Sequence, residues 1–272
     1  MPLNRTTSGS GQLHITRVGE RSLVTRAFAA SPLRWLTPRN HGWAAWVFTS
    51  TFGGGLVDGD ALTIGIDVAP RASALLATQA ATKVYRSRSG TSVDLAATIH
   101  AGGLLAVAPD PVVCFAGSRY RQSQHFELDD TASLVFIDWM TSGRRASGER
   151  WQFDRYESRV RVRRGGRLAL LDALTLTPEA GDLPRRMGRF DTLCMVALIG
   201  PSLEAHSARI VSQVAALAVR RRAAVLVGAS PIDGGCVVKL AAASTEDIAR
   251  TVRQYLAFLP ALLGDDPWAR KW

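Results

Sequence analysis

Short stretches in which apolar and polar residues alternate recur along the first two thirds of the chain. At 62–68, Ile64 and Ile66 alternate with Thr63 and Gly65. Side chains two residues apart lie on the same face of a strand, so this period of two predicts strands that bury one face. The predicted strands comprise a hairpin at 12–26 and single strands at 44–51, 62–68, 74–78, 93–99, 104–108, 120–126, 134–140, 159–163 and 168–176.

Turn residues separate these strands at intervals of roughly ten residues. Gly102 and Gly103 follow one predicted strand, and Gly165 and Gly166 follow another. Many short strands separated by such turns are typical of a β-sandwich or of another wound β architecture. We therefore expect a mainly β fold, a sandwich-like or β-superhelical stack of many short strands.

Two helices are expected near the C-terminus. Apolar residues at helical spacing predict a helix over 204–222 with arginines at its C-terminal end, where cations interact favourably with the helix dipole. Ser244 has the character of a capping-box residue and begins a second predicted helix, 244–259. Pro260 and Gly264 are expected to end it.

Between these helices, 225–227 and 236–240 are predicted strands around a Pro-Ile-Asp-Gly turn. The last third is therefore a small α+β part. We expect one domain over 1–272, in which a β region at 12–177 carries an α+β tail at 200–263 packed on it.

The formal net charge of the 272-residue chain is +10, and arginine supplies almost all the positive charge. Lysine occurs only at Lys83, Lys239 and Lys271. The arginines are scattered and form no basic arm, and no RRM, KH or zinc-finger signature is present. This balance favours an acidic protein partner over nucleic acid, which stays a weaker alternative.

The cysteines, Cys114, Cys194 and Cys236, are isolated from one another and odd in number. Such spacing indicates neither a disulfide framework nor a CxxC metal site, and it fits a reducing compartment. The polar N-terminus lacks the apolar core of a signal peptide, and no apolar run is long enough for a membrane span. We expect a soluble, cytoplasmic protein without membrane attachment.

The loop 53–60 combines three glycines with the aspartates of Asp58-Gly59-Asp60. It lacks the lysine of a P-loop, and it leads into a strand where a dinucleotide-binding loop leads into a helix. Its carboxylates would also repel phosphate. The loop is better interpreted as a tight hairpin whose glycines adopt positive φ.

Asp138 lies in a strongly apolar strand, on the same predicted face as Leu134 and Phe136. Burying an isolated carboxylate is costly, so Asp138 needs a partner or water. One interpretation is an ion pair with Arg144. The other is a polar lining that faces an internal channel or a partner surface.

Three carboxylates, Asp60, Asp138 and Glu149, offer hard oxygen ligands that could pass a divalent ion transiently. Carboxylates alone do not hold nickel tightly, because nitrogen and sulfur donors compete better. No GxSxG or HExxH motif is present, and the sequence predicts no catalytic residues. An alternative is a hydrolase that uses Asp138 and Glu149 as an acid/base pair.

Five blocks of the sequence, in order and with matching spacing, resemble the UreD (UreH) family of urease accessory proteins. The resemblance covers roughly 12–177, is faint from about 180 to 240, and departs from the family pattern at the C-terminal tail. The blocks are STFGGGLVDGD at 50–60, ATQAATKVYR at 77–86, PDPVVCF at 109–115, FIDWMTSGR at 136–144, and GERW at 148–151 with Phe153.

The resemblance implies a non-enzymatic chaperone with a superhelical β fold. Such a protein binds urease apoprotein and the partner UreF, which recruits the GTPase UreG. Nickel reaches the urease active site through an internal polar passage, no cofactor is tightly bound, and GTP belongs to the GTPase. The matched blocks give the candidate partner or passage residues: Asp60, Thr82, Lys83, Tyr85, Asp138, Arg144 and Glu149, of which Asp60, Asp138 and Glu149 form the candidate nickel path.

Overall fold

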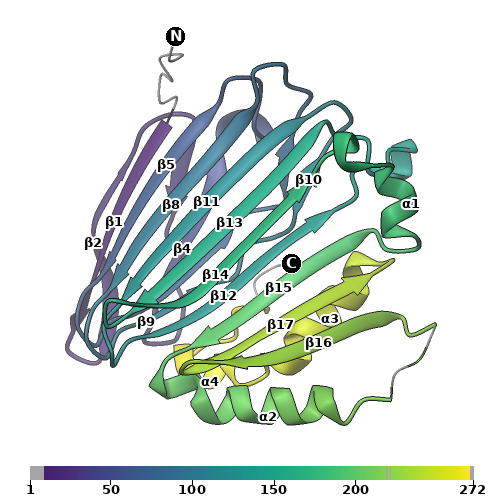
Figure 1. Ribbon diagram of the computed structural model, residues 1–272. Helices are drawn as coiled ribbons and strands as arrows, with labels where there is room; N and C mark the ends of the chain where they lie inside the picture. The colour runs from purple at the N-terminus through teal and green to yellow at the C-terminus, as the bar shows by residue number, and fades with distance from the viewer. Residues whose placement is uncertain (1–8, 219, 221, 270–272) are drawn as a thin grey trace.

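Two β-sheets lie face to face and helices cover the outer side of one of them (Figure 1). The computed structural model describes residues 9–218, 220 and 222–269. The seven-stranded sheet is called sheet A here, and the ten-stranded sheet is called sheet B.

Sheet A has the strand order β14-β13-β11-β8-β5-β1-β2. The pairs from β1 through β5, β8 and β11 to β13 are parallel, and the two edge pairs are antiparallel. The strands are β1 (Gly9–Val18), β2 (Arg21–Ala29), β5 (Ala61–Val68), β8 (Thr91–Ile99), β11 (Arg119–Leu128), β13 (Arg155–Arg164) and β14 (Arg167–Leu176).

Sheet B has the order β16-β17-β15-β12-β9-β6-β4-β3, and the short strands β7 and β10 pair with each other beside β12. Its parallel part runs from β4 through β6 and β9 to β12. The strands are β3 (Leu33–Leu36), β4 (Ala45–Thr51), β6 (Ser73–Thr78), β7 (Thr82–Val84), β9 (Leu104–Val107), β10 (Val112–Cys114), β12 (Ser133–Thr141), β15 (Thr192–Ile199), β16 (Val225–Ile232) and β17 (Gly235–Ala242).

The chain alternates between the two sheets as it proceeds. From β4 onward it passes from sheet B to sheet A and back, so that β5, β8, β11 and β13 stack in one sheet while β6, β9 and β12 stack in the other. Parallel neighbours need a crossover connection, and here a strand of the opposite sheet provides it. This winding confirms the mainly β, superhelical fold expected from the sequence.

The glycine loop that we expected to be a hairpin turn is instead one of these crossovers. Strand β4 belongs to sheet B and β5 belongs to sheet A, so the loop between them spans the two sheets. Gly53 and Gly59 do adopt positive φ, at 82° and 87°. At Gly55 a Cβ would lie 2.6 Å from the Tyr85 ring, so the backbone approaches too closely for a side chain. Local turn chemistry does not reveal which sheet the next strand joins.

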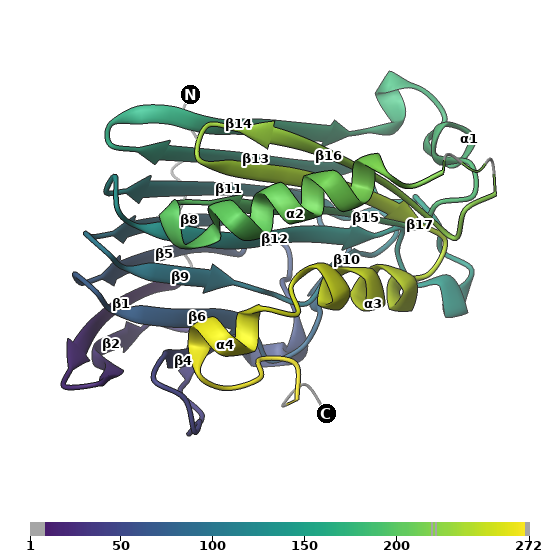
Figure 2. The same ribbon diagram turned by 90° about the horizontal axis from the view of Figure 1, so that it is seen from below.

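Two apolar layers hold the structure together. Inward residues of both sheets, such as Ile64, Phe126 and Phe136, form the layer between the sheets. The outer face of sheet B forms the second layer with the C-terminal helices, where Ile210 and Ile248 are fully buried. Figure 2, which views the molecule from below, shows these helices in front of sheet B. They are α2 (Glu204–Ala215), α3 (Thr245–Tyr255) and α4 (Leu259–Leu263), and the remaining helix α1 (Leu183–Met187) lies between β14 and β15 in sequence.

The predicted helix over 204–222 is too long. Helix α2 ends at Ala215, so Arg220 and Arg222 lie beyond its last turn and do not interact with its dipole, and Arg221 lies outside the described residues. Leu217 is 53% exposed. Most helical stability comes from packing of an apolar face, and the chain loses that packing after Ala215.

The predicted end of the second helix, 244–259, is also wrong. Ser244 caps α3 as expected, accepting a hydrogen bond from the Asp247 amide, but α3 ends at Tyr255. Pro260 lies in the first turn of α4 and Gly264 ends that helix with φ 79°. Proline is tolerated in a first turn because its missing N–H has no partner there, so it begins a helix here instead of closing one.

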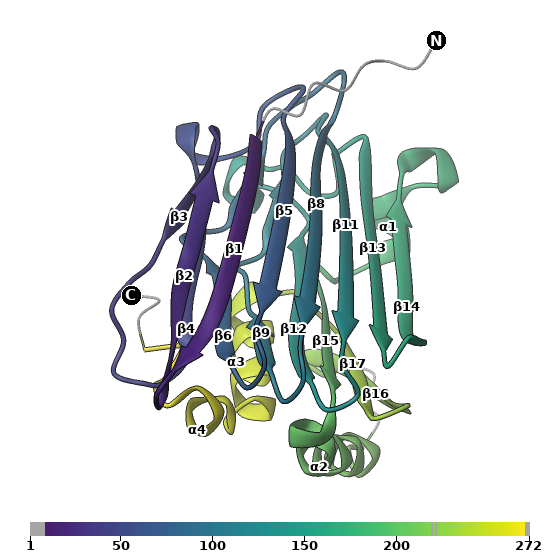
Figure 3. The ribbon, with the colours of Figure 1, turned by 90° about the vertical axis from the view of Figure 1, so that its left-hand side faces the viewer.

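The outer face of sheet A carries no covering element among the described residues (Figure 3). Arginines and carboxylates alternate along it, for example Arg121 with Asp94 at 2.9 Å. None of the described helices is long and apolar enough to cross a membrane.

Candidate functional site: two cavities that meet at Asp138

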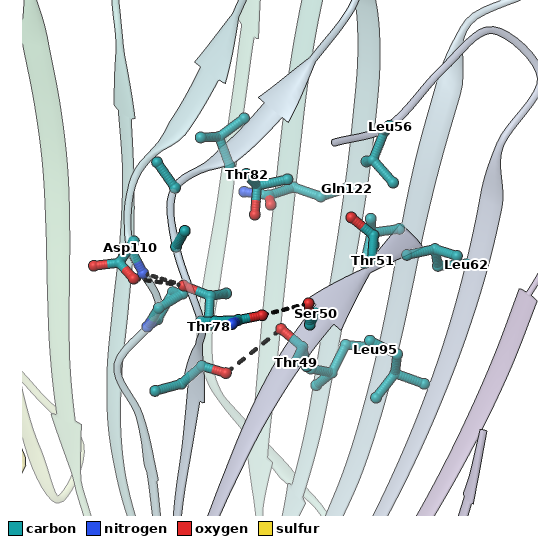
Figure 4. A pocket seen from close by; sticks show the side chains of 18 of the residues that line it. Thr49, Ser50, Thr51, Leu56, Leu62, Thr78, Thr82, Leu95, Asp110 and Gln122 are labelled. Carbon is teal, nitrogen blue, oxygen red and sulfur yellow. Dashed lines mark hydrogen bonds between the residues drawn. The ribbon is translucent and has the colours of Figure 1, made fainter. Parts of the chain in front are cut away.

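A cavity of about 280 Å³, lined by apolar side chains and by hydroxyl, amide and carboxyl groups, lies between the two sheets, near the loops that follow β4 and β6. Both sheets contribute to its wall, with Leu62 and Leu95 from sheet A and Leu76 from sheet B. Figure 4 shows its hydroxyl and amide side chains around a common space. The polar lining residues are Thr49, Ser50, Thr51, Thr78, Gln79, Thr82, Asp110, Gln122, Gln124 and Asp138.

Hydrogen bonds fix the side chains at the mouth of this first cavity. The Thr78 hydroxyl donates to Asp110 Oδ2 over 3.0 Å and accepts from the Asp110 amide over 2.7 Å. The Ser50 hydroxyl donates to Gln79 Oε1 over 2.6 Å. These bonds join the end of β6 to the loop that follows β9 and to the end of β4, so the cavity wall is held in place by the chain itself.

Asp138 links the two sheets at the inner end of the first cavity. It projects from β12 of sheet B, and its Oδ1 accepts from Gln122 Nε2 over 2.7 Å. Its Oδ2 accepts from the Ser158 hydroxyl over 2.6 Å. Gln122 and Ser158 are register partners on β11 and β13 of sheet A. The expected ion pair with Arg144 is not formed, and neutral donors hold the Asp138 carboxyl in its place.

Burial raises the pKa of Asp138, and the hydrogen bonds from Ser158 and Gln122 offset this only in part. The charge of Asp172 raises the pKa of Asp138 further. Beside it, burial also raises the pKa values of Tyr120 and Tyr156, which therefore stay neutral hydroxyls. Asp138 is therefore the acidic group of this network, and burial disfavours its charged form.

A second cavity of about 500 Å³ lies on the other side of Asp138, towards the edges formed by β14 and β16. Asp138 and Trp139 line both cavities. At the outer part of the second cavity, Asp172 forms an ion pair with Lys239, which joins β14 of sheet A to β17 of sheet B. Cys194 also lines this cavity, and burial raises the pKa of its thiol well above the ordinary value.

Three aspartates therefore mark successive points along the two cavities. Asp110 lines the first, Asp138 lines both, and Asp172 lines the second. Among the described residues, no group of three or more His, Cys, Asp or Glu side chains is arranged to hold a metal ion. The described residues thus offer single carboxylates along the two cavities, of which Asp172 is already paired with Lys239, and no closed coordination site.

Glu149 has a different environment from Asp138. It pairs with the Arg144 guanidinium, accepts a hydrogen bond from the Ala116 amide over 3.2 Å, and its side chain is 14% exposed. The hydrogen bond from Arg144 is the main cause that lowers the pKa of Glu149. Arg144 in turn lies over the Phe115 ring, 4.2 Å from its centroid, and Tyr85 packs edge-on against the same ring. Three candidate residues, Tyr85, Arg144 and Glu149, thus form one cluster.

The other candidate residues are separate from that cluster. Asp60 closes its own turn by accepting from the Val57 amide over 2.9 Å. Thr82 lines the first cavity, whereas Lys83 points outward from β7 and is exposed. The structure therefore brings Thr82 and Asp138 to one cavity, and it places Asp60 and Glu149 outside both cavity linings.

Sequence reasoning missed most of the cavity wall. Gln122, Asp110 and Asp172 line the cavities, and Ser158 holds Asp138 without lining either of them. All four are polar residues in otherwise ordinary strands or turns, and the pairing of distant strands places them. The one available signal was that Gln122 shares a strand face with Tyr120 and Phe126, which are buried. A polar side chain on a buried face needs a partner, and that partner is Asp138.

Comparison with known proteins decides the family. A family model described as UreD urease accessory protein matches residues 7–272. The chain belongs to the UreD family. It is 54% identical to the urease accessory protein UreD of Sorangium cellulosum, over 97% of this chain and 85% of that relative. The corresponding protein of Anaeromyxobacter is 43% identical, over 97% and 89%. Urease accessory protein D of Arabidopsis thaliana is 32% identical, over 96% and 99%.

The UreD match includes the segment 180–240, where the resemblance was faint. That segment contains β15, β16 and β17, which extend sheet B and form one wall of the second cavity. The part of the chain with the weakest motif signal thus contributes to the same internal space as the strongest blocks.

Proposed function

We propose that this chain is a non-enzymatic scaffold of urease maturation that binds urease apoprotein and conducts nickel towards its active site. Membership of a family named for urease accessory proteins supports the pathway. The observation that supports the transport role is that Asp138 lines both of two neighbouring internal cavities. Nickel is cargo in this proposal, and the chain holds no resident metal.

The chemistry of the cavities suits transfer better than storage. Asp110 and Asp138 supply carboxylate oxygens at separate points of the first cavity, and hydroxyl and amide groups supply the remaining contacts, whereas Asp172 is paired with Lys239. Oxygen ligands bind nickel more weakly than imidazole or thiolate. Burial raises the pKa of the Cys194 thiol in the second cavity, so the thiolate form is disfavoured there before an ion arrives.

Asp138 can also respond to a passing ion. Burial raises the pKa of its carboxyl group, so the charged form is less favourable than in an exposed carboxyl group. A divalent cation beside the carboxyl group favours the charged form and so lowers that pKa. Burial and the cation therefore act on this carboxyl group in opposite directions.

A carboxylate-based hydrolase is less well supported. That mechanism requires Asp138 and Glu149 to face one substrate from a shared cavity. Glu149 lines neither cavity that Asp138 lines, and it is engaged by Arg144 and the Ala116 amide. The two carboxyls therefore have no common substrate space.

The resemblance supplies the remaining parts of the proposal. In the cytoplasm, the chain joins UreF, UreF recruits UreG, and GTP is bound and hydrolysed by UreG alone. Nickel passes from these partners into one cavity mouth and leaves towards urease from the other. No tightly bound cofactor and no nucleic acid or membrane take part.

Co-expression of a urease operon with and without this chain, at limiting nickel, tests the proposal. We expect urease activity and nickel content to depend on the chain, and we expect urease and the UreF homologue to co-purify with it. Full nickel loading in its absence would overturn the scaffold role.

A further inference from the structure

Three arginines line a surface pocket that the cavities do not include. Arg86, Arg88 and Arg119 surround a space of about 460 Å³ together with Asp154. Ser87 is buried between exposed Arg86 and Arg88, so these two side chains share the outward face of an extended segment. We propose that this pocket binds carboxylate side chains of an acidic segment on a protein partner.

The backbone around the pocket is fixed by its own hydrogen bonds. The Ser87 hydroxyl accepts from the Arg119 amide over 2.9 Å, and the Ser87 amide donates to Gly117 O over 3.2 Å. Gly117 has φ 69°, and a Cβ there would lie 3.2 Å from the Arg86 side chain. Gly117 therefore lets Arg86 lie across the loop, and the guanidinium groups are presented from a rigid frame.

The charges of the pocket are unbalanced. Arg119 interacts with Asp154 at 3.4 Å, with both side chains about half exposed. Arg86 and Arg88 make no ion pair with any other described residue. Three guanidinium groups thus face one carboxylate. A guanidinium fork matches a carboxylate in geometry and charge, which favours an acidic ligand.

The backbone argues for a carboxylate ligand and against a phosphate. Phosphate sites usually use free backbone amides gathered in a nest. Here the amides of Ser87, Gly117 and Arg119 are engaged inside the chain, and the Ala116 amide donates to Glu149. Most backbone amides of the pocket lining are therefore engaged, and the guanidinium groups are the main donors left for a ligand, as expected for recognition of acidic side chains.

The inference rests on the scaffold function for its biological meaning, but its test uses only the purified chain. Titration with hexaglutamate, followed by calorimetry, is compared between the wild type and Arg86→Glu/Arg88→Glu. We expect binding to weaken at least about tenfold in the variant and to weaken as salt is raised. Arg86→Gln/Arg88→Gln, which only neutralises the two charges, is a second variant in case reversal disturbs folding, and we expect it to weaken binding as well.

Arg167→Glu is the control. The Arg167 side chain is 75% exposed, and Arg167 lies on β14, opposite Arg164 at the end of β13 that is far from the pocket. It should change hexaglutamate affinity by no more than about twofold. An equal loss in this control, or no hexaglutamate binding by the wild type, would overturn the proposal. Pyrophosphate binding that depends on Arg86 without hexaglutamate binding would overturn the carboxylate assignment. Each of these results leaves the operon experiment on the scaffold function unaffected.

Discussion

Asp138 and Glu149 belong to neighbouring blocks of the sequence, yet the fold gives them opposite environments. Asp138 faces two cavities, has only neutral hydrogen-bond donors and has a raised pKa. Glu149 is held by a guanidinium and a backbone amide and has a lowered pKa. A carboxylate that stabilises its surroundings is paired, whereas a carboxylate without a cation is available to one that arrives. This difference supports the proposal that Asp138 takes part in transport and that Glu149 has a structural role.

The largest expected effect comes from Asp138→Asn. The amide keeps the shape: its oxygen can accept from Gln122 and its NH2 group can donate to the Ser158 hydroxyl, but it cannot carry the charge that attracts a cation. Urease activation in cells should fall at least about tenfold, while complex formation and folding are retained. Asp94→Asn, a carboxylate on the exposed face of sheet A, is the control and should activate urease normally. Equal activation by the two variants would contradict the transport role of Asp138.

Glu149→Gln should act on stability instead. It removes the charge that pairs with Arg144 and weakens the bond to the Ala116 amide, so the free energy of unfolding should fall by about 1.5–3 kcal/mol. Urea denaturation followed by tryptophan fluorescence measures this. Activation per folded molecule should stay at the wild-type level, and Arg144→Ala should reproduce the destabilisation. A stable Glu149→Gln chain that fails to activate urease would reverse our assignment.

The two carboxylates should also differ in the pH dependence of stability. The raised pKa of Asp138 costs stability as the pH rises from its unfolded value, about 3.9, through its folded pKa. Asp138→Asn should therefore be at least as stable as the wild type at neutral pH, and this advantage should disappear in acid.

The pH dependence that Glu149 gives to the free energy of unfolding has the opposite sign. Its lowered pKa contributes stability that is fully present above the unfolded value, about 4.3, and is lost as the pH falls through the folded pKa. The loss of unfolding free energy caused by Glu149→Gln should therefore become smaller in acid. Unfolding free energies of the three chains between neutral pH and about pH 3 check both signs, and parallel curves would argue that the environments do not differ.

The smallest effect is expected from Ser158→Ala, which removes one donor to Asp138. The pKa of Asp138 should rise further, stability should fall by about 1 kcal/mol, and activation should decline less than in Asp138→Asn. Ser123→Ala, on the outward face of β11, is the matched control and should leave activation unchanged. A larger loss of activation than in Asp138→Asn would mean that Ser158 itself, not the carboxyl group, limits transfer.

The strands were predictable because their period of two and their turn residues are local properties. The partner of Arg144 was not predictable, because Asp138 and Glu149 are both close to it in sequence. Only the path of the chain after β12 places Glu149, and not Asp138, beside Arg144. The prediction of a hairpin at the glycine loop was wrong for the same reason, since the loop residues specify a turn but not the sheet that the next strand joins. The cavity wall depends on register between distant strands, such as Gln122 with Ser158. No local pattern contains that information.

The most direct test of the account is the nickel content of urease purified from cells that carry either the wild-type chain or Asp138→Asn, at limiting nickel. Nickel per urease active site is measured by elemental mass spectrometry, with the amount of assembled complex matched between the two samples. The account predicts urease that lacks most of its nickel with Asp138→Asn and loaded urease with Asp94→Asn. Fully loaded urease with Asp138→Asn would contradict passage of nickel along this carboxyl group.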